Sequence, residues 1–126
     1  MGANETGLHG ESLAAEFLTR RGYRVIDRNY HSRYGEVDII ALSDAYIVFV
    51  EVKVRQAGGK LHPLEAVSPS KCRKLVKTAL LYLQTHPEYQ ELQPRFDVAA
   101  ITIEPRTNRK WFDYLSNVFE ADEGWI

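Results

Sequence analysis

The chain has 126 residues, of which 44% are hydrophobic and 26% are charged, with a formal net charge of −1. This length suits one domain, and this composition excludes disordered and fibrous proteins. The near-neutral total also excludes a protein that holds nucleic acid by bulk positive charge, although a local basic surface stays compatible with it.

The first half of the chain predicts one helix followed by three strands. Apolar side chains recur at helical spacing before Gly22, which is a natural helix stop. Three segments rich in β-branched residues come next, and the short turn at Ser43 and Asp44 predicts that the last two form an antiparallel hairpin. The expected elements are a helix over residues 5–21, strands over 23–29, 36–42 and 46–54, and a turn over 30–35.

The second half predicts another helix and two further strands. Residues 55–69 have the glycines and prolines of a loop, and the apolar stripe after them predicts a helix ended by Pro87. The expected elements are this helix over residues 70–85, strands over 95–103 and 111–115, and an acidic, aromatic tail. The order α-β-β-β-α-β predicts one α/β domain over residues 1–126, with a mixed sheet and helices on both faces.

The sequence predicts a cytoplasmic protein. Cys72 is the one cysteine, so it allows no internal disulfide and fits a reducing compartment. The N-terminal residues lack the pattern of a signal peptide. The longest apolar run, residues 46–50, is far shorter than the ~20 residues that span a membrane, so no membrane partner is expected.

Charged residues stand inside two apolar strands. Side chains alternate between the faces of a strand, so Glu51 and Lys53 end a row that otherwise belongs to the core. The hairpin can bring Asp38 and Glu51 together on one face. In residues 36–42 the alternation predicts Glu36, Asp38, Ile40 and Leu42 on one face, with Val37, Ile39 and Ala41 on the other.

The first helix repeats this pattern, because Glu11 lies within the stripe that should face the sheet. Glu11, Asp38 and Glu51 are therefore expected to converge, with Lys53 beside them. Buried carboxylates need neutralisation, and hard oxygen ligands suit Mg²⁺ or Mn²⁺. Taken alone, each motif has an ordinary alternative: an exposed Glu-x-Lys ion pair, or a glutamate at the rim of a helix.

At these residues the sequence resembles the PD-(D/E)xK nuclease superfamily. More narrowly, it is similar to the YraN-like family of small bacterial predicted endonucleases, which resemble archaeal Holliday-junction resolvases. Val37 stands where the superfamily name has proline, a variation that the resolvase branch shares. The matching segments are G-x-x-G-E at 7–11, GYRVIDRN at 22–29, GEVDIIA at 35–41, VFVEVKVR at 48–55, AVSPSKCRKL at 66–75 and RFDVAAI at 95–101.

This resemblance implies a restriction-endonuclease-like core and a role for each matching residue. Asp38 and Glu51 match the metal-binding acids, Lys53 matches the catalytic lysine, and Glu11 matches a first-helix acid that assists metal binding. The Val52 carbonyl is a further candidate ligand. Glu36 lies two residues before the motif aspartate, and its role stays open between a supporting and a substrate contact.

Basic residues gather in two segments, which predicts a basic rim around the acidic pocket. Residues 20–33 hold five arginines against Asp27, and residues 53–77 hold seven basic residues against Glu65. The alternative is that the basic residues of the second helix form only its solvated face. The candidate nucleic-acid contacts are Arg33, Arg55, Lys71 and Lys74.

The leading hypothesis is a Mg²⁺-dependent or Mn²⁺-dependent endonuclease that hydrolyses DNA, with branched and repair intermediates among its candidate substrates. A non-catalytic nucleic-acid-binding or partner-recruiting module is the alternative, and the sequence leaves RNA open as a substrate. Asp97 is expected to be a structural acid or the partner of an arginine. The aromatic C-terminal residues suit core packing or the contact of a homodimer.

Overall fold

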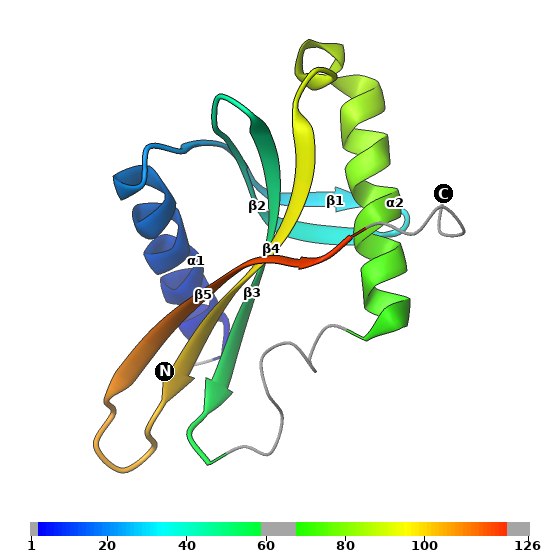
Figure 1. Cartoon of the computed structure of the whole chain (residues 1–126). Coiled ribbons are helices and arrows are strands. Elements are labelled where there is room, and N and C mark those ends of the chain that lie inside the picture. The colour runs from blue at the N-terminus through cyan, green and yellow to red at the C-terminus, as the bar shows by residue number, and fades with distance from the viewer. Residues whose placement is uncertain (1–2, 59–67, 121–126) are drawn as a thin grey trace.

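The computed structural model describes residues 3–58 and 68–120, with side chains from Gly10 onward, and centres on a sheet covered by helices on both faces (Figure 1). Its elements are α1 (Ala3–Arg20), β1 (Arg24–Ser32), β2 (Gly35–Leu42), β3 (Tyr46–Gln56), α2 (Pro69–Thr85), the 3-10 turn η2 (Pro87–Tyr89), β4 (Gln93–Ile103) and β5 (Lys110–Phe119). The predicted α-β-β-β-α-β order is confirmed, and it is that of a restriction-endonuclease-like α/β core.

The five strands lie in the order β1-β2-β3-β4-β5. Only β3 and β4 are parallel, and they pair along their whole length, from Tyr46 opposite Gln93 to Gln56 opposite Ile103. A parallel pair needs a crossover connection, and α2 lies in it. The sheet is therefore mixed, as predicted.

The β2–β3 hairpin pairs only part of β3. Its ladder runs from Leu42 opposite Ile47 to Ile39 opposite Val50, and there it stops. Beyond that point β1 and β2 run across toward α2, while β3 continues beside β4 (Figure 1). Among the strand pairings of the described residues, the second half of β3 has only β4 as a neighbour, so its other edge is open.

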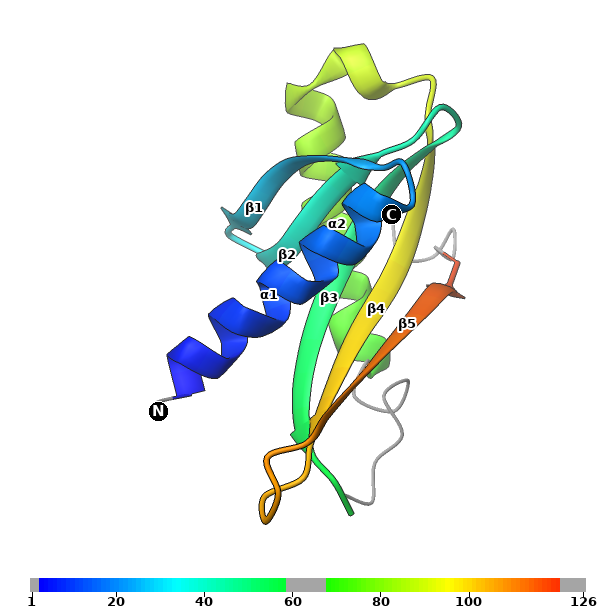
Figure 2. The same ribbon diagram turned by 90° about the vertical axis from the view of Figure 1, so that its left-hand side faces the viewer.

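Two apolar clusters hold the helices against opposite faces of the sheet, and Figure 2 shows α1 in front of the sheet with α2 behind it. On β3, Val48 and Val50 are fully buried and pack under α1. The α1 cluster contains Ala14, Ala15, Leu18, Ile39, Ala41, Val48, Val50 and Ala99. The α2 cluster contains Val37, Ile40, Leu42, Ile47, Phe49, Leu75, Val76, Ala79, Tyr82 and Phe96.

The predicted faces of β2 are wrong at Val37. This side chain packs under α2 together with Ile40 and Leu42, rather than on the α1 side with Ile39. The alternation of side chains fails here because β2 turns away from β3 between Asp38 and Ile39. Strict alternation assumes an unbent strand, and β2 stays paired with β1 at Val37 but has parted from β3 there.

Three predicted segments differ in length. The turn expected over 30–35 shrinks to Arg33 and Tyr34, because Ser32 still pairs with Gly35 and its hydroxyl accepts a hydrogen bond from the Tyr34 N–H. The third strand continues to Gln56 along β4, within the expected loop. The last strand extends through residues 116–119, into the expected tail. Residues 59–67 and 121–126, including Lys60, Glu65 and Trp125, lie outside the described residues.

Both edge strands carry an irregularity. The β1–β2 register shifts between Val25 and Asp27, and Asn29 has a left-handed backbone with φ of 53°. The β4–β5 register shifts between Phe96 and Val98, opposite Asn117, whose φ is 52°. No helix of the described residues is long and apolar enough to cross a membrane.

Gly10 sets the approach of α1 to the sheet. A Cβ placed there would lie 3.2 Å from side-chain carbons of Val52, Val54 and Ile101. We therefore expect Gly10→Val to lower the free energy of unfolding by about 1–3 kcal/mol, because the helix must move outward. Urea unfolding measures this change. Ser12→Val at an exposed position of the same helix is the control, and an equal loss in both variants would contradict the close packing.

Candidate active site

Asp38 lies at the point where β2 leaves β3. Its Oδ2 accepts a hydrogen bond from the Val52 N–H at 2.7 Å, beyond the last paired residues of the hairpin. A side-chain carboxylate thus supplies an acceptor to a backbone donor at the open edge of β3. The N–H and C=O of one strand residue point to the same side, so the Val52 carbonyl faces this edge too.

Three other carboxylates surround Asp38 within electrostatic range. Burial raises the pKa of Asp38 to about 7, the hydrogen bond from Val52 opposes this rise, and the negative charges of Glu51, Glu11 and Glu36 add to it. A rise of this size shows that the site resists a further negative charge. Glu11, Asp38 and Glu51 are therefore electrostatic neighbours, but the predicted convergence of the three carboxylates at one point is wrong among the described residues.

Glu11 enters from the α1 side of the sheet. Glu11 is 8% exposed, and its Oε1 is buried without a hydrogen-bond partner among the described residues. The close approach of α1 at Gly10 places this carboxylate against the sheet. A buried oxygen acceptor without a donor is costly, and it suits a ligand that brings positive charge.

Glu51 lies on the opposite face of β3, toward α2. Its side chain is 13% exposed, and Oε1 lies 2.8 Å from Nζ of Lys71. The α2 helix begins at Pro69 after the N-cap Ser68, whose Oγ accepts a hydrogen bond from the Lys71 N–H. From the sequence, Lys71 was predicted to contact nucleic acid. The ion pair with Glu51 was missed, because a local sequence pattern does not predict a contact between residues 20 positions apart. Lys53 is half-buried on the same strand face as Glu51.

The acids are neighbours without being gathered at one point. Among the described residues, no three acidic, histidine or cysteine side chains stand close enough to share a metal ion. Glu11 comes from one face, Glu51 from the other, and Asp38 from the edge between them. The donor set still fits a hard divalent cation, because it consists of carboxylate oxygens and includes the unpartnered Glu11 Oε1. Asp38, Glu51 and Glu11 are the residues that would hold it.

The β1–β2 turn gathers basic side chains against α2. The guanidinium of Arg33 lies 5.0 Å from the ring centre of Tyr34, and the ammonium of Lys77 lies 5.5 Å from it. The turn is fixed to α2 by a 3.1 Å hydrogen bond between the Ser32 and Thr78 hydroxyls. Lys74 lies on the same stretch of α2, facing Gly35.

Arg55 is placed apart from that turn. Its Nε donates a hydrogen bond to Thr102 Oγ1 at 3.0 Å, which holds it against β4. Of the four candidate nucleic-acid contacts, Arg33 and Lys74 therefore share one surface. Lys71 pairs with Glu51 at the start of the same helix.

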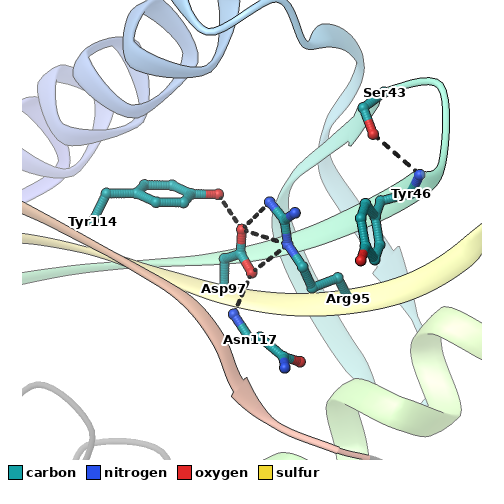
Figure 3. A network of polar contacts seen from close by, with 6 residues as sticks. All are labelled: Ser43, Tyr46, Arg95, Asp97, Tyr114 and Asn117. Carbon is teal, nitrogen blue, oxygen red and sulfur yellow. Dashed lines mark hydrogen bonds and ion pairs between the residues drawn. The ribbon is translucent and has the colours of Figure 1, made fainter.

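A second buried carboxylate, Asp97, has a structural role (Figure 3). Its side chain is 0% exposed and pairs with Arg95 at 2.9 Å, so the expected arginine partner is confirmed. It also accepts hydrogen bonds from the Tyr114 hydroxyl at 2.6 Å and the Asn117 N–H at 2.8 Å. Asp97 therefore ties β5 to β4 at its irregular point, and the sequence had no signal for these two donors.

A restriction-endonuclease-like core with acids at its open strand edge defines a protein of the nuclease-fold class. The chain belongs to the family described as "Uncharacterised protein family UPF0102", which it matches over residues 10–101. This family is the YraN-like, nuclease-fold family that the motifs predict.

Relatives with the family name cover most of the chain. A UPF0102 protein of Syntrophomonas wolfei is 42% identical over 115 residues, which are 91% of this chain and 97% of the relative. A UPF0102 protein of Geobacter sulfurreducens is 46% identical over 115 residues, which are 90% of this chain and 88% of the relative. One from Rhodococcus opacus is 48% identical over 97 residues, with 77% and 81% covered.

The raised pKa of Asp38 makes stability depend on pH. The carboxyl has a pKa of about 7 in the folded protein against an ordinary value of 3.8, so the folded state holds the proton more tightly. The contribution of Asp38 to stability is therefore largest under acid conditions and falls as the pH rises through about 7. Asp38→Asn should remove this fall. Between about pH 5 and about pH 8, the free energy of unfolding of the wild type should drop by on the order of 1–3 kcal/mol more than that of the variant.

Urea unfolding at both pH values, in EDTA, measures this difference. The exposed Asp44→Asn variant controls for the loss of one carboxylate. Parallel pH profiles for the wild type and Asp38→Asn would refute the assigned environment of Asp38.

Proposed function

We propose that this protein is a Mg²⁺-dependent or Mn²⁺-dependent nuclease that hydrolyses phosphodiester bonds in DNA. The observation that carries the proposal is the buried oxygen of Glu11, without a partner among the described residues, near Asp38, whose pKa is raised by burial and further by the surrounding carboxylates. Such a concentration of negative charge at an open strand edge lowers stability, and a divalent cation relieves it. Membership of a nuclease-fold family supports the same conclusion.

Each residue has a defined task in this proposal. Asp38 and Glu51 hold the cation, with Glu11 and the Val52 carbonyl as further ligands. A divalent cation supplies a polarised phosphoryl oxygen and a bound water of lowered pKa. Asp38 must lose its proton to act as a ligand, so the site favours neutral to alkaline conditions.

Lys53 contributes the fixed positive charge. It lies two residues after Glu51, so its side chain leaves β3 on the same face. Attack of water forms one P–O bond and breaks the bond to the leaving oxygen, which takes up a proton. Negative charge grows on the phosphoryl oxygens in between, and Lys53 stabilises that charge.

The surface beside these acids suits the backbone of a nucleic acid. The helix α2 carries four basic residues and no acid over its 17 residues. The β1–β2 turn adds Arg33 to this surface. Arg33 and the basic residues of α2 thus form a basic strip beside the acidic site, and such a strip attracts phosphates.

One observation favours a second function, a non-catalytic nucleic-acid-binding module. The ammonium of Lys71 already neutralises Glu51, and the acids are not gathered at one point. In such a module the basic strip would bind nucleic acid without any cation. Binding would then be sensitive to salt and indifferent to the acids.

Nuclease assays with purified protein separate these functions. We expect Mg²⁺ or Mn²⁺ to support cleavage of one or more of duplex, flap and four-way-junction DNA. Asp38→Asn and Glu51→Gln should each lower the rate by about a hundredfold or more, because each removes a cation ligand. The exposed Glu88→Gln variant is the control.

Cleavage that persists at the wild-type rate in both acid variants would refute the assigned site. Binding without cleavage, unchanged in both variants, would establish the non-catalytic module. Cleavage confined to matched RNA substrates would move the proposal from DNA to RNA.

The basic strip gives a separate prediction about affinity. Lys74→Ala and Arg33→Ala should each weaken DNA binding and should reduce the slope of log affinity against log salt by about 0.9, because each loses one phosphate contact. Fluorescence anisotropy at several salt concentrations measures both effects. Arg24→Ala, at the far end of β1, is the control with the same loss of charge. An equal change in all three variants would show that only total charge matters.

A further inference from the structure

We propose that Lys71 is an internal counter-ion of Glu51. A divalent cation that binds Glu51 displaces the Lys71 ammonium, and this ammonium then binds a substrate phosphate. This inference rests on the proposed function, because it requires a cation at the acidic site. It adds that Lys71 competes with the cation for the carboxylate of Glu51. The ion pair of 2.8 Å between Lys71 and Glu51 is its starting observation.

Without a cation, Glu51 carries an electrostatic cost. Its side chain is 13% exposed, and its charge contributes to the raised pKa of Asp38. A largely buried carboxylate beside other acids destabilises the fold unless a positive group compensates it. The Lys71 ammonium provides this compensation from α2.

The side chain of Lys71 is free to leave Glu51, although its backbone is fixed. Ser68 caps the helix and accepts a hydrogen bond from the Lys71 N–H, and Pro69 begins the first turn. The side chain is 38% exposed and has four flexible carbons. Exchange therefore requires rotation of a side chain and no movement of the helix.

Binding of the cation gives the Lys71 ammonium a new place. A cation that is coordinated by Glu51 repels the ammonium beside the same carboxylate. The freed ammonium remains on the face of α2 that also carries Lys74, one turn further along the helix. The exchange thus transfers one positive charge from the protein's own carboxylate to the surface proposed for DNA.

The ion pair with Lys71 adds to the separation of the acids, which begins with their positions on opposite faces of the sheet. Lys71 holds Glu51 toward α2, whereas Glu11 approaches from α1 and keeps an unpartnered oxygen. Glu51 can turn toward Asp38 only after its contact with Lys71 has broken. Lys71 should therefore lower the affinity for the cation while it stabilises the cation-free protein.

Titration calorimetry with Mn²⁺, in the absence of DNA, tests this competition. Lys71→Met keeps the length of the side chain and removes its charge, and we expect it to bind Mn²⁺ about tenfold more tightly than the wild type, a change of ~1.4 kcal/mol. Lys74→Met removes the same charge one turn away and serves as the matched control. Equal or weaker binding in Lys71→Met than in Lys74→Met would overturn the proposal.

Thermal unfolding gives a second measurement that does not depend on activity. In EDTA, Lys71→Met should melt below the wild type, and adding Glu51→Gln to it should restore most of the loss. In Mn²⁺ the Lys71→Met variant should gain more stability than the wild type. A melting temperature that the charge on Lys71 does not change in EDTA would contradict its role as counter-ion.

The outcomes for the two proposals can be told apart. Mn²⁺ binding that is lost in Glu51→Gln but unchanged in Lys71→Met supports the acidic site and overturns only the exchange. Binding of Mn²⁺ by Lys71→Met alone supports both proposals. Absence of binding in both the wild type and Lys71→Met overturns both.

Discussion

The separation of β2 from β3 is the constraint on which the candidate site depends. The hairpin is paired only to Ile39, and beyond it the Asp38 carboxylate takes the Val52 N–H as its hydrogen-bond donor. A continued ladder would set Asp38 opposite Glu51 and cover the edge of β3 with backbone. The early parting instead leaves the edge open, with a carboxylate beside it. The acidic site is thus a consequence of an incomplete sheet.

The rest of the fold compensates for this opening. The other edge of β3 is paired with β4 over all eleven of its residues, so the strand that carries Glu51 and Lys53 stays in place. Gly10 lets α1 approach closely enough to bring Glu11 against the sheet. The α2 helix neutralises Glu51 through Lys71. Each acid is therefore carried by a helix or strand that is held in place. The unfavourable interaction between the carboxylates is confined to the region where these elements lie close together.

Local patterns predicted the elements and the identity of the acids, because both depend on periodicity. The burial of Glu11 is a consequence of helical spacing, and the structure confirms it. The face of Val37 and the pairing of Lys71 with Glu51 could not be predicted in this way. The first depends on where a ladder ends, and the second on a contact between a strand and a helix that are distant in sequence. The functional roles of these residues stay predictions until they are measured.

The two irregular edge strands have a consequence for the behaviour of the protein at high concentration. A flat edge strand presents unpaired backbone groups on which another chain can build. Here each outer strand contains a left-handed asparagine and a shift in register, with Asn29 in β1 and Asn117 in β5. The N–H of Asn117 is also taken by Asp97 and so cannot pair with another strand. The outer strands β1 and β5 are therefore poor templates for edge-to-edge growth.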